Sequence, residues 1–129
     1  MLVRRRDESP RNERGNGQVS HLLMAGGDFG SSHLAVTWVE ALPGSRQPLH
    51  AHAHSEQVYV IVGGRGVMIA GDEEREVEAG TLVFIPPETP HAIKNVGEEM
   101  LVYVSASSPP FPAEVRGDSW IPGEQAVSG

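Results

Sequence analysis

The sequence predicts an all-β protein that folds as one closed or two-sheet antiparallel barrel. With 129 residues the chain has the size of a single domain and is too short for two stable cores. Its fifteen glycines and ten prolines favour many turns over long helices. Its apolar residues fall in short runs, several of them rich in valine and isoleucine, which is typical of strands.

About nine strands are expected, beginning at Val19. They are Val19–Met24, Leu34–Leu42, Leu49–His54, Gln57–Val62, Val67–Ala70, Arg75–Glu78, Thr81–Ile85, His91–Lys94 and Met100–Ser105. Turn-forming pairs such as Gly26-Gly27, Pro43-Gly44 and Pro86-Pro87 separate these runs. Short strands at this spacing indicate an antiparallel barrel.

The two ends of the chain have a different composition from the middle. Residues 1–18 are polar and charged and are expected to form a flexible arm, in which Arg4–Arg6 are solvated rather than bound to phosphate. Residues 19–106 are expected to form the barrel. Residues 107–129 are rich in proline and serine, which predicts an irregular strap anchored by residues such as Trp120.

Composition also excludes several classes of function. The chain has no cysteine, which removes disulfides, thiolate metal sites and cysteine nucleophiles and fits a reducing, cytoplasmic environment. A net charge of −7 disfavours nucleic acid as a partner. No apolar stretch is long enough for a membrane span, and polar residues follow Arg4–Arg6 where an export signal would be apolar. We therefore expect a cytoplasmic protein without nucleic-acid or membrane partners.

Three of the six histidines alternate in one short segment, at positions 50, 52 and 54. If this segment is a strand, their imidazoles share one face, with neighbours ~6.5 Å apart and the outer two ~13 Å apart. Nitrogen ligands lie ~2.0–2.1 Å from a metal ion, so an adjacent pair can converge on one ion and the outer two cannot. One pair is expected to bind, and the remaining histidine has another role.

A fourth histidine follows a proline-rich turn. The expected strand Thr81–Ile85 ends at Pro86-Pro87, and His91 opens the next strand. Such a turn fixes the direction in which His91 enters the barrel, as a third ligand requires. His21 and His33 stand alone and are expected to be ordinary surface or core residues.

The spacing of these residues resembles the two sequence motifs of the cupin superfamily. In the first motif five residues separate a glycine, here Gly44, from His-x-His, and an acidic residue or its substitute follows after three or four more residues. The second motif is matched by Gly80, Pro86, His91 and Asn95, with Glu88 where the family has an internal glycine. The resemblance spans roughly residues 34–104 and rests on both motifs together.

Membership of this family implies an antiparallel double-stranded β-helix, also called a jelly roll, in a single domain. It also implies one divalent transition metal per chain, held by His50, His52 and His91 together with a fourth ligand. With no thiolate available, Fe, Mn, Ni, Zn, Co and Cu all suit imidazole ligands, and the residues do not choose among them.

Two neighbouring residues compete as the fourth ligand. Glu56 has the preferred chemistry, because a carboxylate is anionic. Gln57 has the better spacing, because in the motif six residues separate the ligand from a glycine that starts a Gly-x-Gly turn, here Gly64-Arg65-Gly66. Adjacent strand residues point to opposite faces, so one of the two reaches the ion. We predict Gln57, with Glu56 as the alternative.

The resemblance implies an enzyme acting on a small oxygenated molecule, with dioxygenase-like, decarboxylase, isomerase or lyase chemistry. A non-catalytic binding or sensing protein is the alternative. His54 and Tyr59 are candidate catalytic residues, and Trp38 is expected in the core rather than the cavity. The expected core and cavity walls are Tyr59, Ile61, Met68, Phe84, Ile93 and Tyr103.

A homodimer is expected. In Gln57–Val62 both alternating sets of residues contain apolar side chains, which leaves a second hydrophobic face to be covered.

Overall fold

Nine strands and two short 3-10 helices make up residues 1–110, the part of the chain that the computed structural model describes. The strands are β1 (Arg11–Glu13), β2 (Gln18–Met24), β3 (Ala35–Ala41), β4 (Glu56–Gly63), β5 (Arg65–Ala70), β6 (Glu73–Glu78), β7 (Leu82–Ile85), β8 (His91–Lys94) and β9 (Leu101–Ser108); the helices are η1 (Arg6–Glu8) and η2 (Asp28–Gly30). The predicted all-β class is confirmed. No helix of residues 1–110 has the length and apolar character needed to cross a membrane.

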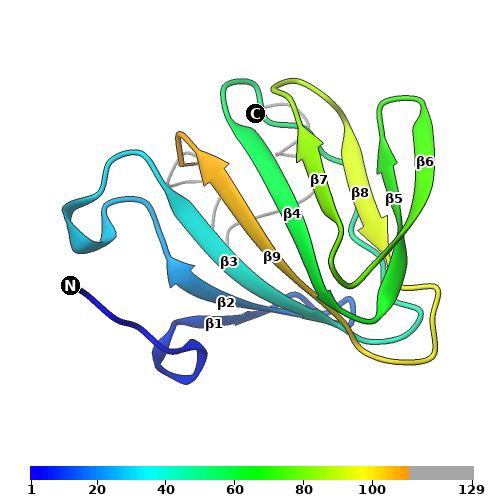
Figure 1. Cartoon of the computed structure of the whole chain (residues 1–129), viewed down its shortest axis with the longest axis horizontal. Helices are drawn as coiled ribbons and strands as arrows, with labels where there is room; N and C mark the ends of the chain where they lie inside the picture. Colours follow the sequence, from blue (N-terminus) through cyan, green and yellow to red (C-terminus); the bar gives the residue numbers. More distant parts are fainter. Residues whose placement is uncertain (111–129) are drawn as a thin grey trace.

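The strands form two antiparallel sheets. The larger sheet has six strands in the order β1-β2-β3-β9-β4-β7, and the smaller has three in the order β6-β5-β8. In Figure 1 the strands of the larger sheet run side by side, and β8, β5 and β6 follow beyond β7. From β4 to β9 the chain passes repeatedly between the sheets, because β4, β7 and β9 belong to the larger sheet and β5, β6 and β8 to the smaller.

The core lies between the sheets and is built by alternation along each strand. On β4, Tyr59 and Ile61 are buried, whereas Val60 and Val62 point outward and are exposed. Of the residues expected in the core or cavity, those that the structure buries are Tyr59, Ile61, Met68, Ile93 and Tyr103. These side chains form one hydrophobic cluster that joins both sheets.

Two expected interior aromatic residues lie elsewhere. The prediction for Phe84 was wrong: it is 53% exposed, because β7 turns Ile85 inward and its neighbour therefore outward. Trp38 is half-buried on the outer face of β3, where its indole Nε1 donates to Glu40 Oε2 at 3.1 Å. The alternation along a single strand does not indicate which of its two faces packs against the core. The locations of Phe84 and Trp38 both depend on that choice.

The expected strand Leu49–His54 is also wrong. Residues 42–55 form an irregular connection between β3 and β4, with isolated bridges at Arg46 and His50. Pro43 and Pro48 have no N–H for a ladder, and Gly44 takes a φ of +84° at a turn. The connection nevertheless follows β8 closely, because the Gln47 N–H donates to the Ile93 carbonyl at 2.9 Å.

The structure contains one strand that the sequence analysis missed. β1 pairs with β2 through Arg11↔His21, Asn12↔Ser20 and Glu13↔Val19. Three consecutive polar residues give no periodic hydrophobic signal, so nothing in the sequence marked them as a strand.

Sheet pairing therefore extends beyond the expected barrel limits of 19 and 106, from residue 11 to residue 108. The flexibility expected of residues 1–18 stays a prediction. In the expected strap, residues 107 and 108 belong to β9, while residues 111–129 lie outside the described part of the chain.

Candidate metal centre

Three histidines converge inside the barrel. His50 and His52 come from the connection before β4, and His91 is the first residue of β8. Their exposed fractions are 1%, 2% and 0%, and one ring nitrogen from each lies within 4.8 Å of the others. Two nitrogens bound to one ion at ~2.1 Å lie up to ~4.2 Å apart, so small rotations of these side chains would close the set on one ion.

The backbone explains how histidines 41 positions apart in the chain come together. His50 and His91 form an isolated antiparallel bridge, with N–H···O distances of 3.0 Å and 2.8 Å in the two directions. Residues directly opposite in such a pair have their side chains on the same face. The His52 carbonyl accepts from the Glu88 N–H at 2.7 Å, which ties the connection to the proline-rich turn.

Glu88 occupies the position where the cupin motif has glycine. Its φ is +67°, so the chain keeps the left-handed turn without the residue that adopts it most easily. The strain is on the order of 1–2 kcal/mol. The turn still places His91 in the histidine cluster, so Glu88 in place of glycine leaves the cluster intact.

Two backbone carbonyls fix which nitrogen faces the interior. His50 Nδ1 lies 2.8 Å from the Pro48 carbonyl, and His91 Nδ1 lies 2.8 Å from the Thr89 carbonyl. A carbonyl accepts hydrogen bonds and does not donate them, so both Nδ1 atoms carry the proton. Each Nε2 therefore presents its lone pair, which is the arrangement found in histidine metal ligands.

Burial keeps the three imidazoles neutral. It lowers the pKa of His50 well below the ordinary value, and the nearby His91 adds to the effect. Burial and His91 lower the pKa of His52 to about 3, and burial likewise lowers the pKa of His91. A protonated imidazole cannot bind a metal, so the site is prepared for ligation at neutral pH without first releasing protons.

Gln57 completes the cluster from β4. Its side chain is buried, its Oε1 lies 3.0 Å from His91 Nε2, and its Nε2 donates to Ser105 Oγ at 2.6 Å. In this orientation two hydrogen-bond acceptors face each other, Gln57 Oε1 and His91 Nε2. Their contact is unfavourable by itself and would become favourable if both atoms bound one cation. With the amide turned over, Gln57 Nε2 would instead donate a hydrogen bond to His91 Nε2 in the metal-free protein. Glu56, one residue earlier, is exposed on the other face.

The arrangement fits a divalent first-row metal held by three imidazoles and one amide oxygen. Among residues 1–110, no other set of three His, Asp or Glu side chains brings its ligand atoms together in this way. If all four side chains held such an ion, they would leave room on it for water or substrate. The ligand roles of His50, His52, His91 and Gln57 stay predictions, but the structure brings all four together and leaves Glu56 outside.

The two candidate catalytic residues differ sharply. His54 is exposed and lies outside the cluster. Tyr59 is buried, its ring meets His91 edge-on with centroids 5.9 Å apart, and its hydroxyl donates to Gln47 Oε1 at 3.0 Å. Burial raises the pKa of Tyr59 well above its ordinary value, so this phenol stays protonated and donates hydrogen bonds.

The remaining histidines, His21 and His33, lie outside the cluster, and two residues were not singled out from the sequence. His21 lies 3.5 Å from Glu40, and His33 is exposed. Sequence reasoning missed Gln47, whose role depends on the contact with Tyr59 across the barrel. It also missed Arg14, which follows β1 and would have been found had β1 been recognised.

A model of the cupin domain family matches residues 37–107, more than half of the chain. The chain belongs to the cupin family. This cupin is 44% identical over 71 residues to an uncharacterized protein of Methanocaldococcus jannaschii, an alignment covering 55% of the chain and 57% of that protein. It is 27% identical over 132 residues to auxin-binding protein 1 of Arabidopsis thaliana, covering 94% of the chain and 66% of that protein. The cupin thus spans less than two thirds of either relative.

Solved structures bear out the fold. A predicted oxalate decarboxylase of Thermotoga maritima superposes with a TM-score of 0.74 at 22% identity, covering 84% of this cupin and 99% of that chain. A double-stranded β-helix protein of Klebsiella pneumoniae gives a TM-score of 0.71 at 21% identity, covering 85% and 91%. The predicted antiparallel double-stranded β-helix is confirmed.

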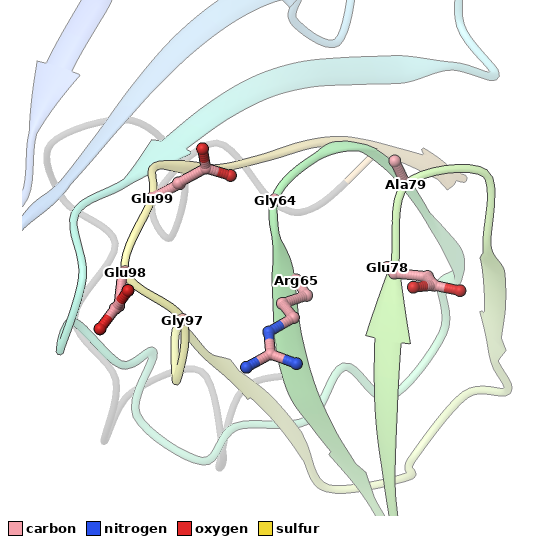
Figure 2. Close-up of a pocket in the computed structure, with 7 residues that line it drawn as sticks. All are labelled: Gly64, Arg65, Glu78, Ala79, Gly97, Glu98 and Glu99. Carbon is pink, nitrogen blue, oxygen red and sulfur yellow. The ribbon is translucent and has the colours of Figure 1, made fainter.

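A hollow of about 450 Å³ lies at the end of the barrel away from the histidines (Figure 2). The β4–β5, β6–β7 and β8–β9 turns surround it. Its charged lining residues are Arg65, Glu78, Glu98 and Glu99. All four side chains are exposed, in contrast to the buried histidines.

Proposed function

We propose that this cupin is a metal-dependent enzyme acting on a small oxygenated organic molecule. The observation that carries the proposal is the convergence of three buried, neutral imidazoles with the Gln57 amide oxygen. A divalent transition metal bound there would polarise a carbonyl, activate water or, if redox-active, bring oxygen and substrate together. Dioxygenase-like chemistry, or related decarboxylase, isomerase or lyase chemistry, fits these capabilities.

The chain's own residues have distinct parts in this proposal. The Pro48 and Thr89 carbonyls orient His50 and His91. Tyr59, kept protonated by burial and lying edge-on to His91, would donate a hydrogen bond to a bound molecule if it left Gln47. His54, exposed outside the cluster, is the candidate for moving protons between solvent and the site.

A non-catalytic binding protein is the second candidate. It is supported by the similarity to auxin-binding protein 1, whose name records ligand binding and which aligns with 94% of this chain. The two candidates make the same prediction for metal content and differ in turnover. A binder would release its ligand chemically unchanged.

The deciding experiment combines metal analysis with a substrate screen. Protein purified without a metal-affinity tag is analysed for bound metals and then tested for oxygen uptake and product formation with small diketones, phenols and hydroxy acids. Turnover that disappears in His52→Ala supports the enzyme. Tight binding of a compound recovered unchanged supports the binder, and metal-free wild-type protein would contradict both versions of the proposal.

We also propose that this cupin is a homodimer. The outer face of the larger sheet carries exposed apolar side chains on β4 and β7, namely Val60, Val62, Leu82 and Phe84. A second copy covering this face would remove them from water. Light scattering of wild type and Phe84→Glu at micromolar concentration tests this: we expect a dimer that dissociates in the variant, and a monomeric wild type would contradict the proposal. The cytoplasmic location stays a prediction.

A further inference from the structure

The side chain of Gln57 can bind a metal with only one of its two ends. Its amide oxygen Oε1 lies 3.0 Å from His91 Nε2, which is the orientation that a metal ion shared by both residues requires. The NH2 end donates hydrogen bonds and does not bind cations. The two ends have nearly the same shape, so packing does not distinguish them. His91 Nε2 is itself an acceptor and by itself favours the NH2 end, so other neighbours must turn the oxygen toward it.

Ser105 anchors the NH2 end of this amide from the neighbouring strand. The pairing of β4 with β9 places Ser107 directly opposite Gln57 and Ser105 opposite Tyr59. Gln57 Nε2 nevertheless donates to Ser105 Oγ, at 2.6 Å, so the hydrogen bond runs diagonally across the two strands. Diagonal neighbours on one face of a sheet lie within reach of long side chains. A hydroxyl group can also donate, so Ser105 holds the amide in place without choosing its end.

Tyr59 supplies the choice that Ser105 does not make. Gln57 and Tyr59 lie two residues apart on the inner face of β4. The Tyr59 hydroxyl donates its one proton to Gln47 Oε1 at 3.0 Å, and the side chain also hydrogen-bonds Gln57. With its proton committed to Gln47, the Tyr59 oxygen can only accept a second hydrogen bond. The end of the Gln57 amide that faces Tyr59 must therefore be the NH2 end.

Burial makes this set of hydrogen bonds decisive. Gln47 and Gln57 are each 4% exposed and Tyr59 is fully buried, so water does not replace a lost partner. With the amide turned over, its oxygen would face the tyrosine oxygen, and two buried acceptors would meet. An unmatched buried polar group is costly, which opposes the preference of His91 for the NH2 end.

We infer that Ser105 and the Tyr59–Gln47 pair are positioning residues that turn the amide oxygen of Gln57, and not its nitrogen, toward the metal at His91. The inference rests on the metal-dependent function proposed above and deepens it. None of the three needs to touch the ion. Their effect reaches it through the Gln57 amide, whose orientation they hold before the metal arrives.

The test measures zinc affinity in competition with a chromogenic chelator. The proteins compared are wild type, Ser105→Ala, Ser105→Thr, Tyr59→Phe and Ser107→Ala. Ser105→Thr keeps the hydroxyl group and serves as the conservative rescue. Ser107→Ala is the matched control, because Ser107 lies on the same face of β9 directly opposite Gln57, whereas the amide donates to Ser105.

Ser105→Ala and Tyr59→Phe should each weaken zinc binding by about 3- to 10-fold, because a positioning residue matters no more than the ligand that it positions. Ser105→Thr and Ser107→Ala should keep the wild-type affinity. Circular dichroism checks the fold of each variant, and the two Ser105 variants decide if Tyr59→Phe does not fold. Wild-type affinity in Ser105→Ala, or the same loss in Ser107→Ala, would overturn the inference.

The same substitutions in a Gln57→Glu background separate positioning from structural support. The two oxygens of a carboxylate are equivalent, so a glutamate at this position needs no neighbour to choose its end. In that background Ser105→Ala and Tyr59→Phe should lower zinc affinity by about twofold or less, and the difference between backgrounds is the coupling that a double-mutant cycle measures. Equal losses in both backgrounds would show a structural role and overturn the inference.

The outcomes distinguish this inference from the proposed function. Normal zinc binding without the coupling to Gln57 removes the positioning role and leaves the metal enzyme standing. The coupling without turnover in the substrate screen removes the enzyme and leaves the positioning role standing. A wild type that takes up no zinc contradicts both.

Discussion

Each end of the barrel carries several side chains able to bind a cation, but the two sets differ in how buried they are and in whether their ligand atoms converge. At one end His50, His52 and His91 are buried with their nitrogens within 4.8 Å of one another. At the other end Glu98 and Glu99 line an exposed hollow and are not among the described groups whose ligand atoms converge. β4 separates the two ends by about 20 Å. The number of residues with ligand-type side chains therefore does not indicate which end of the barrel binds a metal. Solvated carboxylates stay hydrated, whereas buried neutral imidazoles have already lost their water.

The largest difference expected between the two ends is in metal content. His52→Ala and His91→Ala should each lose bound metal by at least ~tenfold, because one imidazole fewer leaves too few donors inside the barrel. Glu98→Gln and Glu99→Gln, at the hollow, should keep the wild-type content. Elemental analysis of tag-free, dialysed protein measures both sets. A wild-type ratio of metal to protein in the two histidine variants would contradict the assignment of His52 and His91 as metal ligands.

At the end of the barrel that carries the hollow, we expect substitutions to affect the free energy of unfolding more than metal binding. A Cβ added at Gly64 would lie 2.4 Å from the Met100 carbonyl oxygen at a φ of +75°. We expect Gly64→Ala to lower the free energy of unfolding by ~3 kcal/mol or more, from backbone strain together with the clash. Gly44→Ala, at a φ of +84° with nothing within 4 Å of the new Cβ, should cost ~1 kcal/mol. Equal losses in urea denaturation would show that the close approach at Gly64 is unimportant.

The histidine end should also make the metal-free protein sensitive to acid. The pKa of each of the three histidines is lower in the folded protein than the ~6.5 of the unfolded chain, so below that pH the unfolded state binds protons that the folded state does not. The free energy of unfolding should therefore fall as the pH falls, by at most ~1.4 kcal/mol per pH unit for each histidine.

Urea denaturation in EDTA between pH 7 and pH 5 tests this dependence. His52→Asn should flatten it, and His54→Asn, which changes an exposed residue, should not. A His52→Asn protein with the wild-type slope would show that His52 does not contribute to the effect.

The most local of these differences is expected within one strand. Gln57→Ala should weaken metal binding by ~10-fold, because it removes the amide oxygen beside His91, whereas Glu56→Ala should leave affinity unchanged. Competition with a chromogenic chelator measures both. The opposite ranking would mean that Glu56, and not Gln57, reaches the ion.

The pairing of residues across the barrel could not be predicted from the sequence. The alternation at positions 50, 52 and 54 was interpreted as a strand, whereas prolines keep the segment out of the sheet and a bridge to His91 places His50. Phe84 was expected inside and lies outside, because alternation defines two faces without saying which one meets the core. Arg14 could not be located at all, since its place depends on β1.

The sequence by itself determined the all-β class, eight of the nine strands and the histidines that converge. These features are local: glycines and prolines set turns, period-two apolar runs set strands, and the spacing of the motif residues marks the candidate ligands. Tertiary structure decided that Gln57 rather than Glu56 lies beside His91, that His54 stays exposed, and that the residues before Arg14 form a strand paired with β2. Each of these depends on register between strands distant in the chain, which is set by burial of the whole core and not by any one segment.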